Sequence, residues 1–105
     1  MSKRLEMLEK MAAQSADPFA RYALALEYGK AERWNEALAT FEALRAASPD
    51  YLPMYLMAGQ LLIERQRGAE ACQWLEAGIE LARRVGDAKA LGELDTARIT
   101  ALGLS

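Results

Sequence analysis

Apolar residues recur along this chain at the three- and four-residue intervals of amphipathic helices. The segment 18–30 carries two apolar stripes on nearly opposite sides, which predicts that it contacts neighbours on two sides. These stripes are Phe19, Tyr22 and Leu26, and Leu24, Ala25 and Tyr28. No alternating run favours a strand. The pattern predicts an all-α protein with helices over residues 3–14, 18–30, 34–47, 51–65, 69–84 and 87–101.

Capping residues stand where these helices are expected to begin and end. Asp17 precedes a proline, which predicts a helix start, because aspartate accepts hydrogen bonds from a helix's first N–H groups. We expect residues 48–50 to end one helix and cap the next, with Pro53 in its first turn. Gly86 suits the left-handed conformation that ends a helix, and Asp87 suits the cap of the helix that follows. The short loops predict that consecutive helices are antiparallel neighbours.

A loose pattern of apolar and small residues repeats after 34 positions, although few of the individual residues are identical in the two copies. The first copy contains Leu24, Ala25, Tyr28, Trp34, Ala37, Phe41, Leu44 and Pro49, and the second contains Ala58, Gly59, Leu62, Gly68, Ala71, Leu75 and Gly78. The small residues among them, Ala25 and Gly59 in particular, allow the two helices of a pair to approach closely. This repeat predicts stacked helix pairs, because stacking buries a continuous core that one pair cannot form alone.

The composition narrows the possible functions. The chain has 105 residues, 52% of them apolar and 27% charged, which is typical of one soluble globular domain. The net charge of −2 disfavours nucleic-acid binding. The longest apolar run, residues 51–63, is too short to span a membrane, and we expect no membrane contact. One cysteine permits no internal disulfide, and we expect a cytoplasmic protein.

Catalytic chemistry is not indicated by the sequence. The chain has no histidine, which removes Ser-His-Asp and Cys-His arrangements and imidazole metal ligands. Its seven glycines are dispersed rather than gathered in a phosphate-binding loop. We therefore expect no catalytic residues, no cofactor and no metal ion. A catalytic domain would require a cofactor that the sequence does not indicate.

The repeated residues resemble the tetratricopeptide repeat family over residues 18–84. The matching residues are Leu24, Ala25, Tyr28, Trp34, Ala37, Phe41 and Pro49 in the first repeat and Tyr55, Gly59, Leu62, Ala71 and Leu75 in the second. The sequence departs from the family pattern at Arg21, Glu32, Leu44, Gln66, Gly68, Gly78 and Arg83. The resemblance implies a right-handed antiparallel helix-hairpin stack of the α-solenoid type. It implies a single domain over 1–105, with an N-terminal flanking helix 3–14, repeats 18–50 and 51–85, and a C-terminal capping helix 87–101.

The resemblance to this family implies that the chain functions in protein–protein interaction and has no catalytic activity. The first helix of each repeat would line a shallow concave groove that binds a protein or peptide, whose identity the sequence does not give. Carried over by position, the groove residues are Phe19, Tyr22, Leu26, Lys30, Tyr51, Leu56, Gln60, Ile63 and Glu64. Their character would suit an amphipathic helix or an extended apolar segment. The Lys and Asn residues with which some members bind a C-terminal carboxylate are missing at the corresponding positions.

Two alternatives to this groove remain open from the sequence. The same apolar face could form a homodimer, which would make the chain a self-associating structural protein, because two repeats bury little surface. The stripe that begins at Phe19 could instead pack beneath the helix at 3–14. The apolar residues of that helix available for such packing are Leu5, Leu8, Met11 and Ala12.

Overall fold

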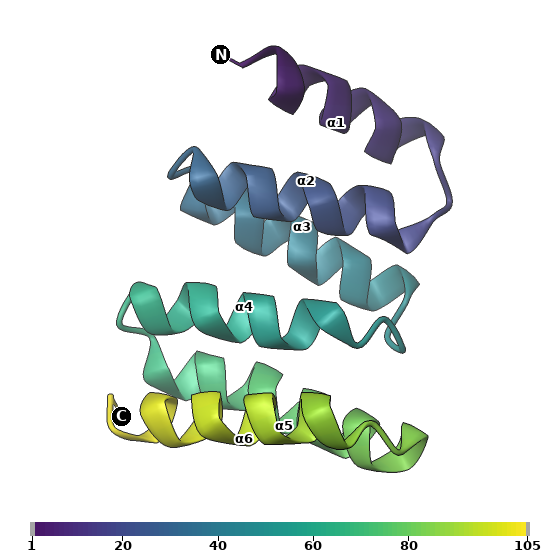
Figure 1. The fold of residues 1–105 in the computed structure, drawn as a ribbon. Coiled ribbons are helices and arrows are strands. Elements are labelled where there is room, and N and C mark those ends of the chain that lie inside the picture. The colour runs from purple at the N-terminus through teal and green to yellow at the C-terminus, as the bar shows by residue number, and fades with distance from the viewer. Residues whose placement is uncertain (1, 105) are drawn as a thin grey trace. The chain divides into compact units, whose positions relative to one another are not determined.

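The computed structural model describes residues 2–104, which form six α-helices and, within that range, no strand (Figure 1). The helices are α1 (Lys3–Gln14), α2 (Pro18–Lys30), α3 (Trp34–Ala47), α4 (Pro53–Glu64), α5 (Gly68–Val85) and α6 (Ala88–Leu102). The chain divides into two compact units, Met1–Tyr51 with α1 to α3 and Leu52–Ser105 with α4 to α6. The all-α fold predicted from the sequence is confirmed. The single domain and the right-handed sense of the stack stay predictions.

The core of the first unit is formed by apolar side chains of α2 packed with those of α3 and α1. Phe41 and Leu44 of α3 are almost wholly buried, together with Leu24 and Ala25 of α2. The side chains of α1 that are buried are Leu5, Leu8 and Ala12. These three lie at positions i, i+3 and i+7, so a single stripe of α1 provides its apolar contacts.

The second unit depends on two glycines that allow close helix contacts. A Cβ atom on Gly59 of α4 would lie 2.6 Å from Cγ of Leu75 in α5. A Cβ atom on Gly78 would lie 2.6 Å from Cβ of Tyr55 and 2.9 Å from Cδ2 of Leu94. Both distances are too short for real carbon atoms, so any larger residue would displace its neighbours. The departure from the family pattern at Gly78 thus has a packing reason.

Most helix ends follow the sequence predictions. Asp17 Oδ1 accepts a hydrogen bond from the Phe19 N–H at 3.0 Å, and Asp87 Oδ1 accepts one from the Ala90 N–H at 2.9 Å. Gly86 has a φ of 77° and ends α5 in the left-handed conformation. These three residues therefore act as the sequence predicts.

The start of α4 differs from the prediction. The helix begins at Pro53, so the cap expected within residues 48–50 is wrong: Leu52 takes the cap position and makes no side-chain capping hydrogen bond. Proline at the first helical position has a fixed φ and no N–H that needs a partner, so it starts the helix itself. Tyr51, predicted to be helical, lies in the loop, where its N–H donates to the Ser48 carbonyl at 3.0 Å.

Helices α2 and α4 end in the same turn, which we call the repeat turn (residues 32–36 and 66–70). Glu32 and Gln66 each have a φ of 60°, a left-handed conformation rarely adopted by residues with a side chain. The Arg33 N–H donates to the Tyr28 carbonyl at 2.9 Å, and the Arg67 N–H donates to the Leu62 carbonyl at 2.8 Å. This pairing closes a helix end in the Schellman geometry. The departure at Glu32 thus falls where the backbone itself favours glycine.

Candidate functional site

The first part of the candidate site is one face of α2. Because Asp17 caps the helix and Pro18 occupies its first turn, the register of α2 is fixed from its first residue. The predicted site residues on this helix are Phe19, Tyr22, Leu26 and Lys30, which share one face by their spacing. Phe19 is 58% exposed. Tyr22 and Leu26 are half-buried, and Lys30 is exposed.

Three aromatic rings meet at the start of this face, and we call Phe19, Tyr22 and Tyr51 the aromatic cluster. The ring centroids of Phe19 and Tyr22 are 6.3 Å apart with an interplanar angle of 48°. Those of Tyr22 and Tyr51 are 5.4 Å apart at 60°. Both are tilted arrangements within the range favoured by aromatic pairs. The family resemblance assigned Tyr51 to the second repeat, and the loop before α4 instead places its ring against α2.

The pKa values of the two phenol groups in the aromatic cluster are raised. Partial burial raises the pKa of Tyr22, and the nearby Tyr51 raises it further. Partial burial also raises the pKa of Tyr51, with a smaller contribution from the negative charge of Asp17. A phenol is already protonated at neutral pH, and these shifts extend the neutral form of both hydroxyl groups further into the alkaline range.

The second part of the candidate site is one face of α4. Leu56, Gln60, Ile63 and Glu64 lie at helical spacing along this face. Leu56 and Ile63 are half-buried, whereas Gln60 and Glu64 are exposed. This face thus pairs two aliphatic side chains with a polar edge and lacks aromatic residues. A continuous groove that joins the α2 and α4 faces stays a prediction.

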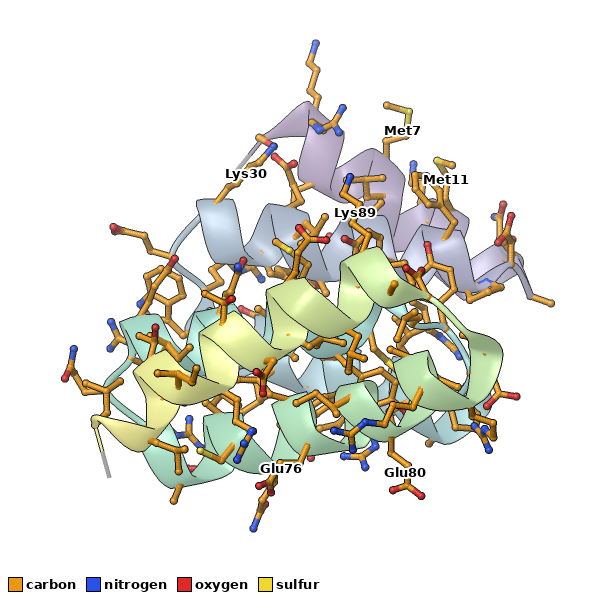
Figure 2. The ribbon with its side chains drawn as sticks, turned by 60° about the horizontal axis from the view of Figure 1, so that its bottom comes forward. Met7, Met11, Lys30, Glu76, Glu80 and Lys89 are labelled. Carbon is orange, nitrogen blue, oxygen red and sulfur yellow. The ribbon has the colours of Figure 1, made fainter. Side chains whose placement is uncertain are left out.

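The alternative in which α1 covers the α2 face is wrong for Phe19. Its ring remains 58% exposed although α1 packs on the same helix. Met11 of α1, expected to take part in this packing, is itself 48% exposed. Met7 and Met11 project from α1, as Figure 2 shows. The contacts of α1 with α2 are made instead on the side of Tyr28 and Glu27.

A polar network on that other side of α2 was not predicted from the sequence. The Tyr28 hydroxyl donates to Glu9 Oε2 at 2.5 Å, and Arg4 Nε donates to Glu27 Oε1 at 3.0 Å. The hydrogen bond to Glu9, followed by desolvation, raises the pKa of Tyr28 to about 12. The Arg33 guanidinium lies over the Tyr28 ring, 4.9 Å from its centroid, in a cation–π contact. This network connects α1 to α2, while Phe19 of the aromatic cluster stays 58% exposed.

The Arg33 side chain also forms a two-pronged ion pair with Glu36, at 2.6 and 2.5 Å. Arg67 and Glu70 repeat the pair 34 residues later, at 2.7 and 2.6 Å. The hydrogen bond from the arginine lowers the pKa of each glutamate. The arginine–glutamate ion pairs could have been predicted, because the same two residue types recur 34 positions apart in the sequence. No local pattern indicated that Glu9 would bind Tyr28.

The second unit contains a cleft of about 500 Å³ between α5 and α6. Its lining residues are Glu76, Ile79, Glu80, Arg83, Asp95 and Arg98. Arg98 lies 3.7 Å from Glu76 and 3.6 Å from Asp95, beyond hydrogen-bond distance. Figure 2 shows Glu76 and Glu80 pointing away from α5. The carboxylates of this cleft, on Glu76, Glu80 and Asp95, are exposed, so they lack the burial that acid–base chemistry requires.

Residues 2–104 show no feature of a metal site or of a membrane-spanning helix. Within this range no three Cys, Asp or Glu side chains are grouped so that they could hold a metal ion. None of the six helices described is both long and apolar enough to cross a membrane.

Comparison with known proteins identifies the family. The sequence model of the tetratricopeptide repeat matches residues 28–94, more than half of the chain. No curated protein matches the sequence significantly. The crystal structure of a tetratricopeptide repeat domain protein from Salinibacter ruber is similar at a TM-score of 0.77 and 43% identity, over 85% of this chain and 100% of that chain.

Two further solved structures agree with this match. The solution structure of the tetratricopeptide repeat domain protein from Salinibacter ruber has a TM-score of 0.78 and 43% identity, over 84% of this chain and 89% of that chain. A protein from Bordetella parapertussis has a TM-score of 0.80 and 28% identity, over 97% of this chain and 90% of that chain. The sequence match, the identity and the helical architecture lead to one conclusion: the chain belongs to the tetratricopeptide repeat family.

Proposed function

We propose that this chain is a protein-interaction module that binds a polypeptide with the exposed face of α2 and the corresponding face of α4. Proteins of the tetratricopeptide repeat family generally act in protein–protein interaction, which supports this class of function. The observation that carries the proposal is the exposure of Phe19 at 58%, beside Tyr22 and Tyr51. Exposed aromatic side chains with buried edges are typical anchors of protein interfaces.

The proposal assigns no catalytic role to the chain. The sequence has no histidine, and no charged side chain is buried within residues 2–104. The proposed partner is a protein or peptide rather than a nucleic acid, because a net charge of −2 offers no excess of cations for phosphate groups. A cytoplasmic location remains part of the proposal and is consistent with a single cysteine.

The proposal is tested by selecting peptide ligands and mapping them onto the two faces. Peptides that bind the purified protein are selected from a random displayed library and titrated against the wild type and three variants. Phe19→Ala and Leu56→Ala each remove one apolar contact of the proposed surface, while Ile99→Ala removes a side chain that is 63% exposed elsewhere. We expect at least tenfold weaker binding for Phe19→Ala and Leu56→Ala.

The same experiment can contradict the proposal. If every selected peptide binds all three variants with wild-type affinity, the recognition surface lies elsewhere. Light scattering during size-exclusion chromatography tests the homodimer alternative on the same samples. A dimer that dissociates in Phe19→Ala but not in Ile99→Ala would show that a second copy of the chain occupies this face.

A further inference from the structure

The sulfur-containing side chains of this protein differ in their exposure to solvent. Within residues 2–104, Met7 and Met11 of α1 are exposed at 55% and 48%. Met54 is wholly buried, Met57 is half-buried, and Cys72 is buried. Figure 2 shows Met7 and Met11 projecting from α1. An oxidant dissolved in water therefore reaches the two thioethers of α1 before the sulfur atoms of the core.

The packing of α1 does not use these two exposed thioethers. The helix is held on α2 by the hydrogen bond between Tyr28 and Glu9 at 2.5 Å and by a stripe of buried apolar side chains. The stripe contains Leu5, Leu8 and Ala12. An oxygen atom added to Met7 or Met11 therefore enters water, whereas one added to Met54 would lie unsatisfied among buried side chains.

Each exposed methionine has a hydrogen-bond donor three residues further along α1. Lys10 follows Met7 at this spacing and Gln14 follows Met11, and side chains three residues apart are neighbours on a helix. Both donors are exposed, and neither side chain has a hydrogen-bond or ion-pair partner within residues 2–104. A thioether is a weak acceptor, whereas a sulfoxide is polar and carries an oxygen atom that accepts hydrogen bonds. An oxidised methionine at either position thus has a free donor beside it.

We propose that Met7 and Met11 form a paired oxidation site, at which a hydroperoxide converts both thioethers to sulfoxides while the protein stays folded. In each step a sulfur lone pair attacks the terminal oxygen of the hydroperoxide, and the S–O bond forms as the O–O bond breaks. The leaving oxygen takes the proton of the attacked hydroxyl and departs as water or an alcohol, so the sulfur is oxidised and the peroxide reduced. Methionine sulfoxide reductases, with a thiol as the reductant, reverse the change. The inference does not depend on the proposed function.

The test treats the full-length protein with hydrogen peroxide and follows the addition of oxygen by peptide mass spectrometry. Tryptic cleavage after Lys10 places Met7 and Met11 in separate peptides, so the rate of each is measured on its own. We expect both to oxidise within about tenfold of the rate of free methionine, and Met54 to oxidise at least about tenfold more slowly than either. Incubation with reductases for both sulfoxide epimers should restore the original masses.

The folded state of the oxidised protein is measured by circular dichroism and urea titration. We expect the helical signal and the free energy of unfolding to equal those of the untreated protein. The double variant Met7→Gln with Met11→Gln imitates the polar state without an oxidant and should be as stable as the wild type. Met54→Gln is the matched control, and we expect it to be much less stable because its polar group is buried.

Three outcomes would overturn the inference. The first is oxidation of Met54 as fast as that of Met7 and Met11, which would show that exposure does not select the site. The second is loss of the helical signal when Met7 and Met11 are oxidised, which would show that α1 depends on its thioethers. The third is sulfoxides at these positions that the reductases leave unchanged. None of these results bears on peptide binding, so the proposed function stands or falls by its own experiment.

Discussion

The two repeats of this protein share their turns and differ in their faces. In the repeat turn, Arg33 and Arg67 adopt the same backbone pairing and form the same two-pronged ion pair with a glutamate three residues later. The preceding residues, Glu32 and Gln66, have the same left-handed φ. Thirty-four residues apart, the different side chains of Glu32 and Gln66 thus occupy the same backbone geometry, each followed by the same arginine–glutamate pair.

The helix faces, in contrast, have diverged. Tyr28 of the first repeat bonds to Glu9 and packs under Arg33, whereas its counterpart Leu62 is a buried aliphatic residue. Ala25 of the first repeat corresponds to Gly59, where the second repeat tolerates no Cβ atom. The comparison teaches that the turn is determined by backbone conformation, which several sequences can adopt, while each face follows from what is packed against it.

The largest effect is expected from filling the space at Gly59. Gly59→Ala places a carbon atom 2.6 Å from Cγ of Leu75, whose side chain is fully buried. We expect the free energy of unfolding to fall by about 1–3 kcal/mol, measured by denaturant titration. Gly59→Ala combined with Leu75→Val should recover part of the loss. If Gly59→Ala has no effect, the close approach that distinguishes the second repeat does not exist in solution.

The next effect concerns the network that only the first repeat has. Tyr28→Phe removes the hydrogen bond to Glu9 and is expected to lower the free energy of unfolding by about 1 kcal/mol at neutral pH. Because the pKa of Tyr28 is raised to about 12 from 10.0, the neutral phenol is favoured in the folded protein. This stabilisation is complete below about pH 10 and is lost as the pH rises towards 12.

Urea titrations of wild type and Tyr28→Phe at several pH values measure this difference directly. We expect the two proteins to converge between pH 10 and pH 12. Tyr22→Phe is the control, because its hydroxyl has no partner within residues 2–104, and it should leave stability almost unchanged at neutral pH. A gap between wild type and Tyr28→Phe that persists at pH 12 would mean that the bond to Glu9 is not its cause.

The same comparison explains how far the sequence could predict the fold. Local features were predictable: Asp17 and Asp87 cap their helices, and Gly86 takes the left-handed conformation. The start of α4 was not, because a cap was expected within residues 48–50, whereas the helix begins at Pro53, which needs no cap. Glu32 was recognised as a departure from the family pattern, but its positive φ is visible only in three dimensions.

The candidate site was predictable in part. Helical spacing placed Phe19 and Tyr22 on one face of α2. The sequence offered Leu5, Leu8, Met11 and Ala12 together as packing residues of α1. Leu5, Leu8 and Ala12 are buried, whereas Met11 is exposed, and this division depends on the orientation of α1, which its sequence alone does not fix. The bond between Glu9 and Tyr28 joins residues 19 positions apart, and no local pattern encodes such a contact.

A smaller effect is expected from relieving strain in the repeat turn. Glu32→Gly and Gln66→Gly should each raise the free energy of unfolding by about 0.5–1 kcal/mol, because glycine adopts φ near 60° without the Cβ clash. Gly86→Ala places an alanine at a φ of 77° and should lower the free energy of unfolding by about 1 kcal/mol. Thermal unfolding of the three variants measures these values. Stabilisation by only one of the two glycine variants would show that the turns differ in energy despite their shared geometry.

The smallest effect separates the two arginines of the repeat turn. Arg33 pairs with Glu36 and also lies over Tyr28, whereas Arg67 forms the same pair at a position where Leu62 offers no aromatic ring. Lysine keeps the charge but loses the planar group that stacks on a ring and forms the two-pronged bond. We therefore expect Arg33→Lys to lower Tm more than Arg67→Lys, and Tyr28→Leu to abolish the difference. If Arg33→Lys and Arg67→Lys lower Tm equally in the protein that retains Tyr28, the exposed ion pair alone accounts for the effect of both arginines. The stack of Arg33 on Tyr28 then contributes no stability to the first repeat.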